Sequence, residues 1–491
     1  MLDRELTHSW GRSRPSRARV ATRRRVVSAI RLVVNSRPSI WSSSEQATGR
    51  SSAHNTHVAV ASPQRPIRLV VRDDDLRRSR LTAFFRLILA IPHLVWLLLW
   101  GIAAFVVAFA LWLAILIEGK APTILHDFVA GYLRYATHVG SYLYLAANPY
   151  PGFRGRPGYP VDLEIDPPER QSRWTAFFRL FLALPALLLT AVLGGGLSIG
   201  SQGGSWGSAS GEPSNAAWTG VTVAGTAAAA AFLAWFAILV LGHAPRGLRD
   251  LVAYALGYGA QTGGYLLLLT GRYPSSDPVL AEPYAELPEH PLRIVIADDL
   301  ERPRLMVVFR LFLAIPHFVW LLLWSVATFV AAVAAWIAAL ATGRVPLALH
   351  RFLAAYVRYV LHLLSFLHLV GRKFPSFTGR DGSYGIDLQI DPRARQSRWK
   401  ILFRLLLALP ALLLGGVLGG VVLVVAFLGW FYAIATGSMP EGLRNLGVSC
   451  LRYGAQLDSY LLLLTDRYPY AAPVLTPRAD DAAVVSPEDS F

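Results

Sequence analysis

The most regular feature of the chain is a long, uncharged apolar run that occurs four times. The first copy begins with RLTAFFRLILAIPH at Arg80, and residues 87–117 of it contain no Asp, Glu, Lys or Arg. A close copy begins at Arg304, and two more divergent copies begin at Arg173 and Arg398. Because an uncharged apolar stretch longer than about 18 residues is typical of a membrane segment, the pattern predicts an integral membrane protein.

Each run is long for one crossing of a bilayer. The first would measure about 46 Å as a straight helix, against about 30 Å of hydrocarbon. In the second copy a Gly- and Ser-rich insertion, residues 194–220, divides the run, and insertions are tolerated at loop tips rather than inside packed helices. Small residues at the equivalent places, Gly101, Ser325 and Gly415, therefore predict a turn and a helical hairpin. The alternative is an interfacial segment that ends at the proline, followed by one long span.

Polar segments of a constant kind flank every run. A short alternation of apolar and polar residues, which is typical of a half-buried strand, precedes each run and begins at Ile67, Val161, Leu292 and Ile386. A Gly-x-x-Pro sequence such as 119–122 follows each run and marks a helix boundary. The next stretch places Asp127, Arg134 and His138 on one helical stripe, which predicts an amphipathic helix lying in the membrane interface.

Together these elements predict a mainly α-helical integral membrane protein built from four repeated units in the order A-B-A′-B′. Each unit would hold a short strand, a helical hairpin in the membrane and an amphipathic interfacial helix. The predicted parts are a disordered basic tail at 1–65, unit A at 66–158, unit B at 159–289 with its insertion at 194–220, unit A′ at 290–383, unit B′ at 384–475, and an acidic tail at 476–491.

Composition and charge support a membrane location and add an orientation. Of the 491 residues 54% are hydrophobic and 16% are charged, well below the roughly 25% of soluble domains, and the formal net charge is +16. The Arg residues flank the apolar runs, which favours the positive-inside rule over a nucleic-acid surface. We therefore expect a multi-pass protein of the cell membrane with its strands and both termini in the cytoplasm. The single cysteine, Cys450, excludes an internal disulfide.

The B units carry a set of motifs that resembles a known family. The motifs are Tyr159-Pro160, Ser172-Arg173-Trp174, Phe178-Arg179-Leu180 and Ala183-Leu184-Pro185, followed by Trp235, Gly242, Pro245, Tyr265 and Arg272-Tyr273-Pro274. The A units show an Ala-Ile-Pro-His form at Ala90–His93 and Ala314–His317. Over residues 65–475 the chain resembles a family of bacterial multi-pass membrane proteins, common in actinobacteria, that is described as a domain of unknown function. The resemblance implies a membrane location and supplies no catalytic residue.

Histidines and carboxylates are the candidate chemical groups. His93 and His317 follow the prolines inside the apolar runs, so they could form an intramembrane polar pair that relays protons, or they could bond carbonyls freed by those prolines. His126 and His138, like His350 and His362, are expected to be solvated at the interface. Carboxylates along two strands could gather a divalent cation or form a solvated face; they are Asp162, Glu164 and Asp166 in unit B and Asp387 and Asp391 in unit B′.

Arginine-rich segments precede the apolar runs and could contact lipid phosphates, although the positive-inside rule explains them equally well. The residues concerned are Arg77, Arg78, Arg80, Arg170, Arg173, Arg302, Arg304, Arg395 and Arg398. No phosphate-binding Gly loop, nucleophile elbow or zinc signature is present in the sequence.

The sequence therefore predicts a non-catalytic scaffold or accessory protein that grips the anionic inner leaflet. Membrane lipids, and a further membrane protein of unknown identity, are the expected partners. We expect no enzymatic activity, cofactor, metal or nucleic acid. A small-solute or ion transporter is the alternative, since internal repeats are frequent in transporters, and a lipid-modifying enzyme is a third reading.

Overall fold

The computed structural model describes residues 65–72, 76–199, 221–278 and 290–473. All of them belong to the second of two compact units of the chain, Gln64–Phe491. Apart from Arg65, the tails predicted at 1–65 and 476–491 lie outside the described residues, as does most of the insertion.

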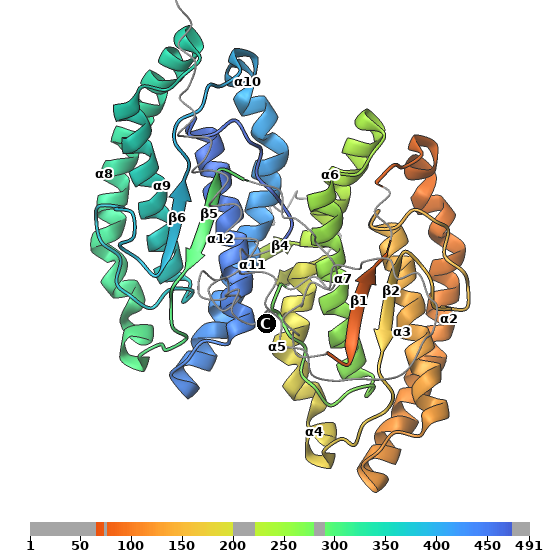
Figure 1. Cartoon of the computed structure of the whole chain (residues 1–491). Helices are drawn as coiled ribbons and strands as arrows, with labels where there is room; N and C mark the ends of the chain where they lie inside the picture. The colour runs from red at the N-terminus through yellow and green to blue at the C-terminus, as the bar shows by residue number, and fades with distance from the viewer. Residues whose placement is uncertain (1–64, 73–75, 200–220, 279–289, 474–491) are drawn as a thin grey trace, which may run out of the picture. The chain divides into compact units, whose positions relative to one another are not determined.

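The described residues form mainly helices with short strands (Figure 1). Unit A contains β1 (Ile67–Val71), α2 (Arg80–Glu118) and α3 (Thr123–Leu143). Unit B contains β2 (Val161–Ile165), α4 (Arg173–Phe177), α5 (Arg179–Leu193), β3 (Gly196–Ile199), β4 (Val221–Ala224), α6 (Thr226–Leu241) and α7 (Arg246–Leu266). Unit A′ contains β5 (Leu292–Ile296), α8 (Arg304–Thr342) and α9 (Leu347–Leu367). Unit B′ contains β6 (Ile386–Ile390), α10 (Arg398–Leu402), α11 (Arg404–Thr436) and α12 (Glu441–Leu461).

The boundaries predicted from the Gly-x-x-Pro sequences are confirmed. A glycine in the left-handed conformation, with φ between 74° and 79°, ends the long helix of each unit; the four are Gly119, Gly242, Gly343 and Gly437. Glycine adopts this conformation at little steric cost, so the helix stops there. The proline three residues later caps the start of the second helix, as Pro122 does for α3.

The predicted helical hairpin is wrong. Helices α2 and α8 are each continuous over 39 residues, and α11 is continuous over 33. They pass through Gly101, Ser325 and Gly415, where the turns were expected, without interruption. Only unit B is divided at this place, because the β3–β4 hairpin and its insertion separate α5 from α6.

The small residues at these positions have another cause, which is close packing of the second helix. A Cβ atom added at Gly101 would lie 3.0 Å from the hydroxyl of Tyr132 in α3. In unit A′ the Ser325 hydroxyl at this place lies 2.9 Å from the Tyr356 hydroxyl of α9. The sequence therefore selects a small side chain where two helices approach, and the helix backbone stays regular.

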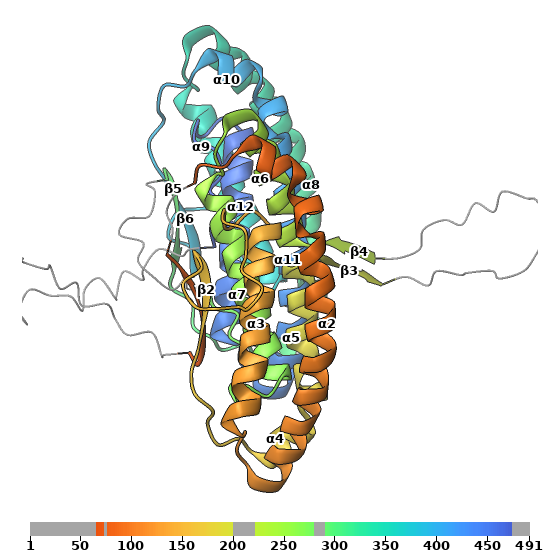
Figure 2. The ribbon, with the colours of Figure 1, turned by 90° about the vertical axis from the view of Figure 1, so that its right-hand side faces the viewer.

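Three layers follow from the contacts between these elements (Figure 2). The long helices form an outer layer, and the second helices α3, α7, α9 and α12 pack on its inner side. Two antiparallel sheets cover the other side of the second helices; β1 pairs with β2 and β5 with β6, so each sheet joins an A unit to a B unit. The second helices therefore lie between the long helices and the sheets.

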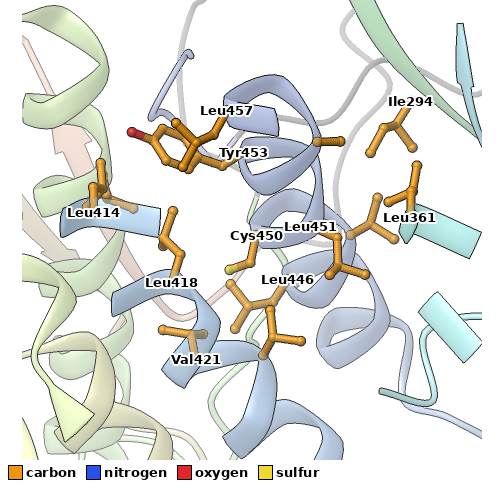
Figure 3. Close-up of a cluster of buried hydrophobic side chains, with 14 of the residues drawn as sticks. Ile294, Leu361, Leu414, Leu418, Val421, Leu446, Cys450, Leu451, Tyr453 and Leu457 are labelled. Atoms are coloured by element: carbon orange, nitrogen blue, oxygen red, sulfur yellow. The ribbon is translucent and has the colours of Figure 1, made fainter. Parts of the chain in front are cut away.

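The two halves of the described fold share one hydrophobic core. Helix α11 contacts α5 and α6 of the first half. Figure 3 shows part of this core, where Cys450 of α12 points toward Leu418 of α11 and Leu446 lies beside it. Cys450 is 6% exposed, and burial raises the pKa of its thiol to about 12.

A buried arginine at the start of each long helix ties that helix to the end of the second helix. In unit A, Arg86 Nη1 donates hydrogen bonds to the carbonyl oxygens of Tyr142 at 2.8 Å and Ala147 at 3.1 Å. Its guanidinium carbon lies 4.3 Å from the centre of the Tyr142 ring. The Tyr142 carbonyl also accepts from the N–H of Leu145 at 3.2 Å, so the guanidinium adds a charged donor at the negative end of the helix dipole. The same arrangement recurs at Arg179, Arg310 and Arg404.

We predict that Arg86→Ala lowers the free energy of unfolding by about 3 kcal/mol, because two buried carbonyl groups lose a charged donor. Denaturant titration of the detergent-solubilised protein, followed by tryptophan fluorescence, measures this. Arg80→Ala is the matched control, since Arg80 is exposed, and it should cost less than about 1 kcal/mol. Equal losses in the two variants would contradict the assigned role of Arg86.

Candidate membrane-facing surface and its polar support

The outer layer exposes large apolar side chains along its whole length. On α2 the buried positions form a single stripe, which consists of Ala83, Arg86, Ala90, His93, Ala104, Leu111 and Ile115. Leu87, Phe105 and Ile117, at 73%, 75% and 71% exposure, lie outside this stripe from one end of the helix to the other. Helix α8 repeats the arrangement with Leu311 and Phe329. Soluble monomers rarely expose contiguous apolar patches of this kind.

Three of the described helices, α2, α8 and α11, are long and apolar enough to cross a membrane, whereas α5 and α6 are apolar but shorter. Between Arg86 and Glu118 helix α2 has no charged side chain, and α8 has none after Arg310. The charged groups of these helices thus lie at their ends or are buried.

The opposite side of the fold is polar. On the sheet formed by β1 and β2, Arg68 Nη2 lies 3.4 Å from Glu164 Oε2 and 3.7 Å from Asp166 Oδ1. Arg72 Nη2 lies 3.2 Å from Glu164 Oε1. These side chains are partly exposed, so this face is suited to water. Figure 2 shows the sheets and the long helices on opposite sides of the second helices.

A buried His–Asp pair joins the second helix of each A unit to its sheet. His138 Nε2 lies 2.9 Å from Asp162 Oδ1, and His362 Nε2 lies 2.9 Å from Asp387 Oδ1. Backbone N–H groups of Gly158 and Leu163 also donate to Asp162, at 2.7 and 2.8 Å. The pairs hold sheet and helix in a fixed register.

The electrostatics of the first pair favour an ionised carboxylate and a neutral imidazole. Burial opposes ionisation of Asp162, but the N–H of Gly158, the His138 ring and the N–H of Leu163 outweigh it and hold its pKa below the ordinary value. Burial also lowers the pKa of His138, against the attraction of Asp162. The neutral His138 ring then donates its Nε2 proton to the Asp162 carboxylate.

The expectation that these histidines are solvated is therefore wrong. His126, His138, His350 and His362 are all buried, at 2%, 2%, 7% and 0% exposure. Four of the strand carboxylates have a bonding partner: Asp162 and Asp387 bond histidines, and Glu164 and Asp166 bond the sheet arginines. The fifth, Asp391, is exposed. Within the described part of the chain, no group of three His, Cys, Asp or Glu side chains is placed to hold a metal ion.

The structure does not bring His93 and His317 together. His93 Nδ1 lies 2.7 Å from the Tyr135 hydroxyl and His317 Nδ1 lies 2.9 Å from the Tyr359 hydroxyl, each within its own unit. Their helices, α2 and α8, lie at opposite edges of the outer layer (Figure 1). Each histidine thus bonds a tyrosine of its own second helix rather than the other histidine.

The arginine segments divide into buried and exposed members. Arg78 and Arg302 are 6% and 0% exposed; Arg302 bonds Asp298 at 2.6 Å and the carbonyl of Leu369 at 2.9 Å. They cannot reach lipid phosphates, so the expectation is wrong for these two residues. The exposed members are Arg77, Arg80, Arg170, Arg173, Arg304, Arg395 and Arg398.

Four of the exposed arginines cap the long helix of a partner unit. Arg80 Nη2 donates to the carbonyl of Val240, near the end of α6, at 3.1 Å, and Arg173 Nη2 donates to that of Ile117, near the end of α2, at 2.7 Å. Arg304 and Arg398 make the equivalent bonds to Ala435 and Ala341. The long helices of paired A and B units therefore run in opposite directions.

Sequence reasoning missed both the buried arginines and the His–Asp pairs. A signal for each was present in the spacing. In three units the buried arginine precedes its aromatic partner by 56 residues, as Arg86 precedes Tyr142. Each histidine precedes its aspartate by 24 or 25 residues. Constant long-range spacing between a charged residue and a polar partner in repeated units points to contact.

These observations define a class of repeat protein with three layers. Long apolar helices form one outer side, charged sheets form the other, and buried arginines and His–Asp pairs bond the second helices between them. Four stretches of the chain, residues 80–154, 219–276, 304–378 and 398–472, match the family described as Domain of unknown function (DUF4389), and together they cover more than half of its length. The chain belongs to this family. The second match begins at residue 219, at the end of the insertion, and contains β4, α6 and α7.

No curated protein and no solved structure is significantly similar to the chain.

We predict that the protein becomes less stable as the pH falls below about 6.5, the ordinary value for histidine. His138 and Asp162 both have folded-state pKa values below their ordinary ones, so the unfolded chain binds more protons on acidification and gains stability relative to the fold. His138→Gln should reduce this slope and cost about 1 kcal/mol at pH 7.5. Unfolding titrations at several pH values test this, with exposed His243→Gln as control. An unchanged slope in His138→Gln would contradict the role of the pair.

Proposed function

We propose that the protein is an integral membrane protein with a structural role, which it performs by binding lipid and a membrane partner rather than by catalysis. The observation that carries this proposal is the exposed apolar surface of α2, α8 and α11, whose exposed charged residues lie at the helix ends. Acyl chains are the environment in which such a surface is stable, because water would solvate it at a high cost in free energy.

The exposed arginines at the helix ends are suited to the phosphate groups of an anionic inner leaflet. Each guanidinium has five N–H donors, so Arg80 or Arg173 can bond a helix carbonyl and still contact a phosphate. Attraction of basic residues to an anionic leaflet, about 1 kcal/mol for each, supports a cytoplasmic location for these segments, the sheets and both termini.

The arrangement of the buried histidines gives less support to the two alternative functions. A transporter would require polar groups along a path, but His93 and His317 are each bonded to a tyrosine of their own unit and lie on different helices. A lipid-modifying enzyme would require an acid and a base open to lipid, whereas His138 and Asp162 are buried against one another.

The first test is extraction from the membrane. We expect the wild-type protein to stay in the membrane fraction after alkaline carbonate washing and to require detergent for release. Phe105→Glu with Phe329→Glu places two charges on the apolar surface and should shift a measurable share of the protein into the carbonate-soluble fraction. Glu164→Gln on the sheet is the control and should not change the distribution. Recovery of the wild-type protein without detergent would refute the proposal.

The second test concerns lipid headgroups. Lipid that copurifies with the detergent-solubilised protein should be enriched in anionic species relative to the total membrane, as measured by mass spectrometry of extracted lipid. Arg170→Gln with Arg395→Gln should lower this enrichment at least two-fold, because both residues are exposed at helix ends. Arg68→Gln on the sheet should leave it unchanged. An enrichment insensitive to Arg170 and Arg395 would argue against phosphate binding there.

A further inference from the structure

We propose that the long helices lie in the plane of the membrane, with the outer layer immersed in one leaflet and the sheets in water, rather than crossing the bilayer. This inference rests on the proposed membrane function and specifies its partner, which is a single phospholipid leaflet. It replaces the expected multi-pass topology. Three features of the fold support it.

The first feature is length. Helix α2 has 39 residues and is about 58 Å long, almost twice the roughly 30 Å of hydrocarbon in a bilayer. Its exposed apolar residues extend from Leu81 to Ile117 without a polar interval that would mark an interface. A helix in the membrane plane has no such limit of length.

The second feature is the opposed direction of paired units. The hydrogen bond of Arg80 to Val240 places the basic segment of unit A at the end of α6, and that of Arg173 to Ile117 places the segment of unit B at the end of α2. Helices that crossed the bilayer would carry these two basic segments on opposite sides, against the positive-inside rule. In-plane helices keep both ends at one interface, beside the phosphates of the same leaflet.

The third feature is the position of the charged sheet. Arg134 of α3 donates to the carbonyl of Leu163 in β2 at 3.0 Å, and the neighbouring Tyr135 bonds His93 in α2. Along the axis of α2, the sheet thus lies level with the apolar part of the helix, on the other side of α3, and not beyond the helix end. In a crossing orientation Arg68 and Glu164 would reach the hydrocarbon, where charged groups are costly. In the in-plane orientation they face water.

The depth of three labels on α2 tests the orientation. Leu87→Cys, Leu98→Cys and Phe109→Cys place a spin label on one side of the helix, because steps of 11 residues rotate it by only about 20°. In reconstituted vesicles of phosphatidylglycerol and phosphatidylcholine, we expect the three labels to have the same depth, within a few ångströms. A profile in which Leu98 is deep and the other two are shallow would overturn the inference. Arg293→Cys on β5 should report water.

Sidedness supplies a second measurement. Arg77→Cys and Lys120→Cys, near opposite ends of α2, should react with a membrane-impermeant maleimide from the same side of the membrane. The wild-type chain is the blank, since its buried Cys450 should react poorly. Labelling of positions 77 and 120 from opposite sides would overturn the in-plane orientation.

The two proposals fail in different ways. Release of the wild-type protein by carbonate would refute the membrane function itself. A protein that resists carbonate but shows the deep central label on α2, or opposite sides for Arg77 and Lys120, would keep its membrane function and lose only the in-plane orientation.

Discussion

The fold depends on one interaction that each unit repeats, the buried arginine that joins the beginning of a long helix to the end of the second helix. In unit A the Arg86 guanidinium donates to the carbonyl oxygens of Tyr142, in the last turn of α3, and of Ala147, in the segment that follows. A buried charge without such partners would be costly, so the arginine and the helix end require each other. This contact fixes the position of α3 along α2. Because α3 carries His138, it also fixes the position of the His–Asp pair and of the sheet.

Pairing of units in opposite directions decides which surface is left for lipid. Exposed arginines such as Arg80 and Arg173 cap the partner's long helix, and each sheet takes one strand from either unit. Through these contacts, polar groups at the helix ends and on one side of the second helices are hydrogen-bonded. What remains uncovered is the outer side of α2, α5, α6, α8 and α11, which is apolar.

Local sequence signals predicted the elements whose cause is local. The strands and the Gly-x-x-Pro helix boundaries were confirmed, because they depend on side-chain alternation and on the conformational freedom of glycine. The turn expected at Gly101 was wrong because a small residue also permits close helix packing, and only the position of Tyr132 distinguishes the two causes. Similarly, His138 was expected in solvent because its partner, Asp162, lies on a distant strand.

By itself the sequence determined that this chain is a four-fold repeat of apolar helices with basic flanks, since repetition and hydrophobicity are properties of the order of residues. Only the tertiary structure decided that the runs in units A, A′ and B′ are single helices and that paired units run in opposite directions. It also decided that the charged sheet lies level with the apolar part of the long helices, on the other side of the second helices. The physical reason is that these features depend on hydrogen bonds between residues 24 to 160 positions apart, and no local pattern specifies which distant partner a buried polar group will find.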